Sequence, residues 1–260
     1  MKIRFMTYNI LFSKAFNELD NILKETKPDI LCLQEVETSE ANFNRFESLG
    51  YALADYSNSF IKFGKIWGVA TYYNKKNLDF SRSVIINLRR SIYEMVLFIL
   101  RGGNKPRTVL DTKFKIKSSK VTLQVFNTHF TMFASNGSRI KQLKETLDDI
   151  PRTGTSPFIL TGDFNYIPYA RKKLESLVAE YGLKEATKDI SFTVRYSYDG
   201  KYVKYGLLQK LAAKFVSRFI TDRSKVDYIF YRNIEAISTK RIDVSYSDHY
   251  PIISTFEVKT

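Results

Sequence analysis

Short apolar runs, several of which alternate apolar with polar residues, recur along the whole chain. A period of two predicts β-strands that are covered on one face. Polar or turn-forming residues bound most of these runs, as expected for short strands in compact sheets. The predicted strands lie at 3–8, 30–34, 51–55, 67–73, 80–87, 93–100, 109–114, 122–128, 158–161, 191–194, 226–231 and 252–258.

A helical period appears in fewer places, where apolar residues recur three or four positions apart. The predicted helices lie at 17–25, 39–49, 138–150, 171–181 and 205–220. No internal repeat, low-complexity stretch or Gly/Pro/Ser linker divides the chain. The sequence therefore predicts one domain over residues 1–260, made of two packed sheets with helices outside them.

Several of the predicted strands end in acid, amide or imidazole groups. These groups are Glu35 after DILCLQ, His129 in VTLQVFNTHF, Asp163 and Asn165 in FILTGDFN, and His249 in VSYSDHYPII. The chain has only two histidines, and both fall in such clusters. We expect these strand ends to converge on one site. The residue types suit a hard divalent metal beside an acid–base pair, a combination used to hydrolyse phosphate esters.

Each of these residues also has a structural explanation. Glu35 is either a ligand for Mg²⁺ or an acid that caps the next helix. Asp163 and Asn165 are two positions apart, so an extended segment points both to one side, although Gly-Asp also forms turns. Asp248 can fix the tautomer of the neighbouring His249, or this histidine has a purely structural hydrogen bond. The placement of both histidines in polar clusters favours the functional interpretation.

Composition limits the partners and the compartment. The net charge of +14 and the pI near 9.6 favour polyanionic partners such as nucleic acid, anionic lipid or polyphosphate, with a solubility surface as the alternative. Because Cys32 is the one cysteine, no internal disulfide can form. The chain shows neither a signal peptide nor a long apolar span, so we expect a cytoplasmic protein, or a secreted one if a leader has been removed.

Six short motifs occur in a fixed order along the chain. They are TYNI at 7–10, LQEV at 33–36, NTHF at 127–130, GDFN at 162–165, KVDYIFY at 225–231 and SDHYPI at 247–252. Together they resemble the endonuclease/exonuclease/phosphatase superfamily of deoxyribonuclease-like, metal-dependent phosphoesterases. The resemblance implies an α/β fold, a four-layer α/β/β/α sandwich of two mixed β-sheets flanked by helices. It also implies a phosphoric ester hydrolase.

The resemblance assigns roles to residues within these motifs. Asn9 and Glu35 are similar to metal-site residues, with Glu35 the principal ligand and Asp248 a further one. The implied cofactor is Mg²⁺, with Mn²⁺ as the alternative. Asp163 would orient the attacking water and Asn165 would bind the scissile phosphate.

The remaining implied roles concern the second carboxylates and the histidines. Asp227 would support the phosphate or a second metal position. Asp248 would orient His249, which would act as general base or stabilise the phosphorane oxygens. His129 would face the phosphate or the leaving group.

One further match points to a branch of the superfamily. SIYEMVLF at 91–98 is similar to a segment of pancreatic-type deoxyribonucleases. Glu94 would then pair with His129 and raise its pKa, unless Glu94 is a strand residue that faces solvent. Two features depart from relatives: abasic-site endonucleases usually have tyrosine at the position of His129, and SFT at 191–193 has phenylalanine where many relatives have tryptophan.

These observations lead to two functional hypotheses. The first is a Mg²⁺-dependent phosphodiesterase, a DNase-like endonuclease that binds nucleic acid as a monomer through basic residues. Those residues are Arg89, Arg90, Arg101, Lys105 and Arg107. The alternative is a sphingomyelinase-like or phosphoinositide phosphatase-like enzyme for lipid or small-molecule headgroups. The basic, amphipathic segment 201–223 motivates that alternative, because such a helix can lie on an anionic membrane. A non-catalytic binder is disfavoured because Asp163 and His249 are both present.

Overall fold

The structure is a computed structural model. It describes residues 1–62, 64–89, 95, 107–119, 121–132, 134–148, 155–167, 169–195 and 223–258. Glu94, nearly all of the expected strand at 93–100 and the expected helix at 205–220 lie outside these residues.

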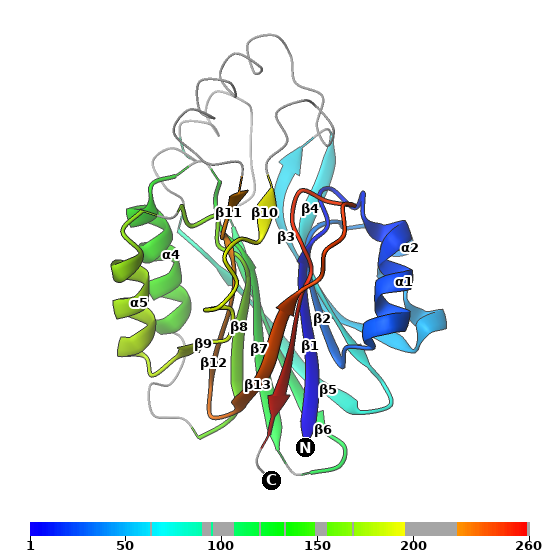
Figure 1. Cartoon of the computed structure of the whole chain (residues 1–260). Coiled ribbons are helices and arrows are strands. Elements are labelled where there is room, and N and C mark those ends of the chain that lie inside the picture. Colours follow the sequence, from blue (N-terminus) through cyan, green and yellow to red (C-terminus); the bar gives the residue numbers. More distant parts are fainter. Residues whose placement is uncertain are drawn as a thin grey trace.

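Two mixed sheets of six strands each pack face to face, and helices cover their outer faces (Figure 1). The first sheet has the order β13–β14–β1–β2–β4–β3, in which β1 and β2 run parallel. Its strands are β1 (Lys2–Asn9), β2 (Ile30–Glu37), β3 (Tyr51–Lys62), β4 (Lys65–Asn74), β13 (Glu235–Arg241) and β14 (Ile252–Glu257).

The second sheet has the order β5–β6–β7–β8–β12–β9, in which β7 and β8 run parallel. Its strands are β5 (Leu78–Asn87), β6 (Thr108–Ile116), β7 (Thr122–His129), β8 (Phe158–Asp163), β9 (Lys184–Glu185) and β12 (Asp227–Arg232). A separate antiparallel pair, β10 (Val194–Arg195) and β11 (Arg223–Ser224), lies beside the sheets.

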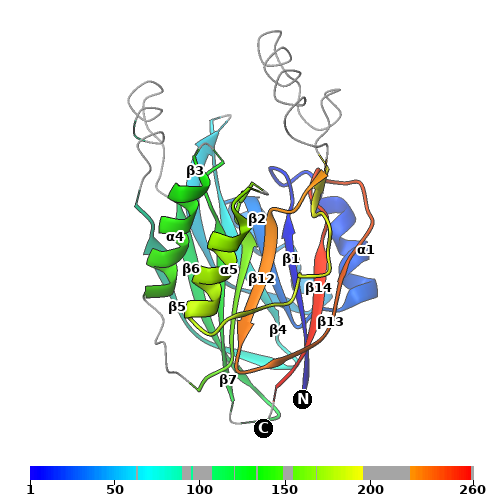
Figure 2. The same ribbon diagram turned by 60° about the vertical axis from the view of Figure 1, so that its left-hand side comes forward.

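Helices form the two outer layers. The helices are α1 (Phe16–Thr26), α2 (Glu40–Phe43), α4 (Asn136–Asp148) and α5 (Arg171–Glu180), with a short 3₁₀ turn, η1 (Glu47–Leu49). Figure 2 shows α4 and α5 side by side over the second sheet. In the part of the chain that the structure describes, no helix is long and apolar enough to cross a membrane.

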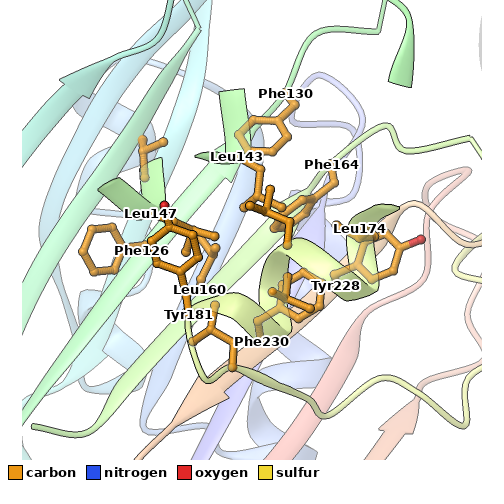
Figure 3. Packing of buried hydrophobic residues seen from close by; sticks show 14 of the residues in the cluster. Phe126, Phe130, Leu143, Leu147, Leu160, Phe164, Leu174, Tyr181, Tyr228 and Phe230 are labelled. Carbon is orange, nitrogen blue, oxygen red and sulfur yellow. The ribbon is translucent and has the colours of Figure 1, made fainter. Parts of the chain in front are cut away.

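The apolar side chains sort into three clusters that separate the four layers. Phe5, Ile30 and Phe114 belong to the cluster between the two sheets. Leu19 belongs to a second cluster, between α1 and the first sheet. A third cluster fills the space between the second sheet and the helices α4 and α5, with Leu143 among its members (Figure 3). This layering confirms the predicted α/β/β/α sandwich.

The helix expected at 39–49 is broken. The structure has one short turn in α2 and a 3₁₀ turn in η1, and Phe46 between them is fully buried. The Phe46 ring packs 5.7 Å from that of Phe16 and 5.1 Å from that of Tyr72. Asn42 donates its side-chain N–H to the carbonyl of Glu37 at 2.9 Å, a local bond that competes with helix formation. Burial of one aromatic ring therefore replaces a continuous helix.

A buried polar contact joins the two sheets beneath the strand ends. Gln34 on β2 donates its side-chain N–H to Oδ1 of Asn127 on β7 at 2.8 Å, and neither residue is exposed. Asn127 in turn donates to the carbonyl of Ala70 at 3.0 Å. Because Gln34 precedes Glu35 and Asn127 lies two residues before His129, this contact fixes the relative positions of the two polar strand ends.

Candidate active site

Strand register places three of the predicted site residues side by side in the second sheet. His129 at the end of β7 pairs with Asp163 at the end of β8 in parallel register. Asp163 also pairs with Asp227 at the start of β12 in antiparallel register. Figure 1 shows that β1 ends, and β12 begins, at the same end of the sandwich, near β10 and β11. The polar strand ends therefore converge, as the sequence predicts.

The GDFN turn sets the direction of the Asp163 carboxylate. Gly162 has φ of 137°, and a Cβ atom at this position would lie 1.8 Å from the carbonyl oxygen of Thr128, so only glycine fits. The buried ring of Phe164 packs 4.9 Å from that of Phe130 and anchors the turn (Figure 3). Asn165 has φ of 49° and donates its backbone N–H to Oδ1 of Asp163 at 2.8 Å. The polar residues are thus held between aromatic anchors.

Glu35 does not close its strand, as the sequence suggests, but lies inside β2 at a bulge. The pairing with β4 shifts between Gln34 and Val36, and Glu35 has φ of 57°. An extra residue in one strand re-aims a side chain, and bulges often lie next to active sites. The backbone N–H of Phe12 donates to Oε2 of Glu35 at 3.1 Å, while Oε1 lies 4.0 Å from Nε2 of His129.

Asn9 connects the first sheet to the carboxylate of the second. Its side-chain N–H donates to Oδ2 of Asp163 at 3.0 Å, and its Oδ1 accepts from the backbone N–H of Leu11 at 3.1 Å. Ser247 donates its hydroxyl to the carbonyl of Asn9 at 2.9 Å. Asn9 therefore aligns Asp163 and the segment before His249 at the same time.

His249 is oriented by Asp227 and not by Asp248, which corrects the sequence expectation. Nδ1 of His249 lies 2.9 Å from Oδ2 and 3.1 Å from Oδ1 of Asp227. Ser247 and Asp248 lie in a bend, and in the described structure no hydrogen bond joins the Asp248 carboxylate to the adjacent ring. Oδ1 of Asp248 instead lies 3.3 Å from the hydroxyl oxygen of Ser247.

The environment of His249 keeps its imidazole charged. Burial by itself would lower the pKa of His249, but the carboxylates of Asp227 and Asp163 raise this pKa well above the ordinary histidine value. Nε2 of the ring lies 3.7 Å from Oδ2 of Asp163. A proton is therefore held on the ring beside Asp163.

His129 lies on the other side of the Asp163 carboxylate, and its pKa is shifted in the opposite direction to that of His249. Burial, followed by the charges of Arg107 and His249, lowers the pKa of His129 well below its ordinary value. This direction is contrary to the raised pKa expected from Glu94, which lies outside the described residues. Nη1 of Arg107 lies 3.4 Å from Nδ1 of His129, so we assign Nδ1 as the acceptor and Nε2 as the protonated nitrogen.

The protonated Nε2 of His129 faces the centre of the site. It lies 3.4 Å from Oδ2 of Asp163 but, among the residues with described positions, has no hydrogen-bond partner, although it is buried. A buried donor without a partner costs free energy unless a ligand satisfies it. One neutral and one charged imidazole thus flank Asp163, which is the separation of titration behaviour expected of an acid–base site.

The donor set beside Glu35 fits a divalent cation. Burial, then repulsion from Asp248, raises the pKa of Glu35 to about 7, and Asp163 adds to this rise. Burial also raises the pKa of Asp163 to about 6. A cation held by the carboxylates of Glu35 and Asp248, with the amide oxygen of Asn9, would remove this repulsion, and Mg²⁺ prefers such oxygen ligands.

A second group of possible ligands consists of Asp163, Asp227 and His249, whose donor atoms lie within 4.8 Å of one another. We assign this group to proton handling, because Nδ1 of His249 is already engaged by Asp227. The carboxylates of Glu35 and Asp248, with the amide oxygen of Asn9, are the ligands that a hard cation would prefer.

Thr193 has a positioning role that the sequence motifs did not indicate. Its fully buried hydroxyl oxygen accepts the backbone N–H groups of Val226 and Asp227, each at 3.0 Å. Its carbonyl accepts the N–H of Tyr250 at 2.9 Å. Thr193 therefore holds the two segments that carry Asp227 and His249. In the sequence, the only signal at SFT is the phenylalanine that replaces the tryptophan of many relatives.

The fold is shared with solved structures of low sequence identity. The human Nocturnin catalytic domain with bound sulfate is 20% identical, with a TM-score of 0.71 over 99% of this chain and 95% of that chain. D. rerio TDP2 complexed with single-strand DNA product is 16% identical, with a TM-score of 0.67 over 99% of both chains. ANGEL2, a 2′,3′-cyclic phosphatase, is 16% identical, with a TM-score of 0.69 over 98% of this chain and 95% of that chain.

A comparison of the sequence with curated proteins gives no match. The family model of the endonuclease/exonuclease/phosphatase family, by contrast, matches residues 6–249. This range includes the bulge at Glu35, the GDFN turn and the Asp227–His249 pair. The chain therefore belongs to the endonuclease/exonuclease/phosphatase family of hydrolytic phosphoesterases.

Proposed function

We propose that this protein is a Mg²⁺-dependent phosphodiesterase that hydrolyses nucleic acid as a DNase-like endonuclease. The observation that carries the proposal is the Asp163 carboxylate between a charged and a neutral imidazole, at 3.7 Å from His249 and 3.4 Å from His129. A phosphodiester needs a positioned water, a proton source and donors for the charge that develops on oxygen. Asp163 can position the water, and the two imidazoles beside it supply the donors.

Each side chain has a task in this proposal. Asp163, with a pKa raised to about 6, accepts a hydrogen bond from the attacking water and orients it. The charged ring of His249, held by Asp227, stabilises the phosphorane oxygens. His129 directs its Nε2–H, which has no hydrogen-bond partner among the described residues, to a phosphate oxygen or to the leaving oxygen.

Asn165 and the metal ligands complete the site. Asn165 donates one side-chain N–H to the carbonyl of Phe130 at 3.1 Å, which orients its amide, and the second N–H is assigned to the scissile phosphate. Glu35 and Asp248, with Asn9, would hold Mg²⁺, or Mn²⁺ in its place. When bound, the cation supplies positive charge for the phosphate oxygens.

We favour nucleic acid as the substrate because the protein is strongly positively charged. The chain carries a net +14, and the Arg107 guanidinium lies at the site itself, beside His129. A backbone of closely spaced phosphates gains most from such a surface. Among similar folds, TDP2 was solved with a single-strand DNA product and ANGEL2 is a 2′,3′-cyclic phosphatase. The lipid alternative rested on segment 201–223, nearly all of which lies outside the described residues, so no described contact favours it.

A substrate panel tests the proposal. Plasmid DNA, single-stranded DNA, RNA, sphingomyelin and inositol phosphates are each incubated with the protein in Mg²⁺ and in EDTA. We expect cleavage of nucleic acid that requires the metal and whose KM rises steeply with salt. Hydrolysis of sphingomyelin or inositol phosphates without cleavage of any nucleic acid would establish the alternative instead.

A further inference from the structure

A shallow hollow adjoins the catalytic pair and has no part in the chemistry described above. It measures about 430 Å³, and its walls include Phe192, Arg223, Arg241 and Tyr250, which we call the arginine–aromatic shelf. Two shelf residues are neighbours of site residues in the chain: Phe192 precedes Thr193, and Tyr250 follows His249. The shelf is therefore attached directly to the segments that carry the Asp227–His249 pair.

The guanidinium of Arg241 lies against both aromatic rings of the shelf. Its Cζ atom lies 3.8 Å from the centre of the Phe192 ring and 4.6 Å from that of Tyr250. Nη1 of Arg241 donates to the carbonyl of Phe192 at 3.4 Å, and Nε donates to Oδ1 of Asp243 at 2.8 Å. These contacts hold a planar cation against an aromatic ring, and the side chain keeps 20% of its surface exposed.

A second arginine contacts the same ring. The Cζ atom of Arg223 lies 4.8 Å from the centre of the Phe192 ring, and the rings of Phe192 and Tyr250 meet edge to face at 5.7 Å. Aromatic rings alone would suit a quaternary ammonium group such as choline, but two guanidinium groups on one ring repel it. They suit a planar group joined to a phosphate, because guanidinium planes stack on bases and pair with phosphate oxygens.

We propose that the arginine–aromatic shelf binds an unpaired nucleobase next to the scissile phosphodiester, with Arg223 at a neighbouring phosphate. A base inside a duplex is already stacked on both faces, whereas an unpaired or terminal base offers a free face. The substrate class is therefore single-stranded nucleic acid, or a duplex with an unpaired nucleotide at the cleavage position. This inference rests on the proposed nucleic-acid phosphodiesterase activity and narrows it.

The test compares substrates with equal phosphates and different bases. One substrate is a short single-stranded oligonucleotide, and the other is an oligomer of the same length built from base-free tetrahydrofuran residues. The base preference is the ratio of their kcat/KM values. Binding of both oligomers, fluorescein-labelled, is measured by anisotropy in EDTA, which gives a readout independent of catalysis.

The variants distinguish stacking on the planar guanidinium from attraction to its positive charge. Arg241→Lys keeps the charge but loses the plane, and Phe192→Leu keeps apolar volume but loses the ring beneath the guanidinium. The matched controls are Arg82→Lys and Phe80→Leu on β5, where both side chains are exposed. We expect the wild-type protein to prefer the oligomer with bases, and each shelf variant to reduce this preference and the binding difference by about 5- to 100-fold.

Two results would overturn the shelf assignment while leaving the phosphodiesterase intact. One is cleavage of both oligomers by the wild-type protein with equal kcat/KM. The other is a base preference that Arg241→Lys and Phe192→Leu leave unchanged, or that the β5 controls reduce equally. If the wild-type protein neither cleaves nor binds any nucleic acid, the proposed function itself fails, and the shelf inference fails with it.

Discussion

The Asp227 carboxylate lies 2.9 Å from Nδ1 of His249 and, with Asp163, keeps this imidazole charged inside the protein. The two residues are 22 positions apart, and the antiparallel pairing of β12 with β8 brings Asp227 beside Asp163. One carboxylate thus orients the ring through Nδ1, while a second lies near its Nε2.

Asp227→Asn should lower kcat by about 10²- to 10⁴-fold, because the amide no longer stabilises the charged ring. Asp248→Asn is the matched change at the neighbouring carboxylate. It should leave the pH dependence of kcat as in the wild-type protein but weaken the response of activity to added Mg²⁺. The double variant Asp227→Asn with His249→Ala should be no slower than His249→Ala alone, since the two residues act as a unit. Additive losses would show that Asp227 acts independently of His249.

Glu35→Gln should weaken the binding of Mg²⁺ to the protein. In EDTA the variant should be at least as stable as the wild-type protein at neutral pH, because burial and Asp248 disfavour the Glu35 carboxylate, whose pKa is about 7. Added Mg²⁺ should raise the melting temperature of the wild-type protein more than that of the variant. Equal shifts in a thermal melt, with unchanged Mg²⁺ dependence of activity, would remove Glu35 from the metal site.

Thr193→Val should impair the site from a distance. Valine keeps the shape of threonine but removes the oxygen that accepts from Val226 and Asp227, which leaves two buried N–H groups without this acceptor. We expect a loss of about 1–3 kcal/mol in the free energy of unfolding by urea. We also expect a fall in kcat of up to about 10²-fold from misplacement of Asp227. Thr193→Ser keeps the hydroxyl, so it should retain most of the free energy of unfolding and most of kcat. Equal losses in Thr193→Val and Thr193→Ser would refute the positioning role of this hydroxyl.

Asp111 supplies a pH test away from the site. Its side chain is 7% exposed, Oδ2 accepts from the side chain of Gln124 at 2.9 Å, and Oδ1 is buried without a partner in the described structure. Burial raises the pKa of Asp111, so the folded state binds a proton more tightly than the unfolded state. The contribution of Asp111 to stability therefore falls as pH rises from about 4, its unfolded pKa, through the raised folded pKa.

Asp111→Asn removes that penalty. The variant should be more stable than the wild-type protein at neutral pH, and the difference should shrink as the pH falls below the unfolded pKa of about 3.9. Thermal melts over this pH range measure it. Asp79→Asn, at a carboxylate with 61% exposure, is the matched control for the change from aspartate to asparagine. A constant difference between Asp111→Asn and the wild-type protein at every pH would contradict the assignment.

The sequence predicts the parts of the fold in which local pattern and tertiary packing agree. Strands such as 122–128 and 226–231 and helices such as 171–181 match the structure to within a few residues. The edge strand β13 escaped prediction because its residues are mostly exposed or half-buried and show no apolar alternation. The strand expected at 191–194 shrank to the short β10, because Thr193 uses its hydroxyl and carbonyl to hold other segments.

The sequence predicts which residues form the site better than it predicts which of them contact one another. The turn at Gly162 and the positions of His129 and Asp163 follow from where the apolar runs end. Two features depend on tertiary structure: the bulge that aims Glu35, and the choice of Asp227 over Asp248 as the partner of His249. Adjacency in the chain suggested Asp248, whereas the pairing of β12 with β8 places Asp227 beside Asp163 and within hydrogen-bond reach of the ring.

The most direct test of the central claim is plasmid nicking by the wild-type protein and by His249→Ala in Mg²⁺. We expect the wild-type protein to nick DNA, EDTA to abolish nicking, and the variant to be slower by about 10²- to 10⁴-fold while its thermal melt shows a folded protein. Absence of nicking over a range of salt and divalent metals would contradict the proposed endonuclease activity. A folded His249→Ala variant within about tenfold of the wild-type rate would contradict the role of His249 in it.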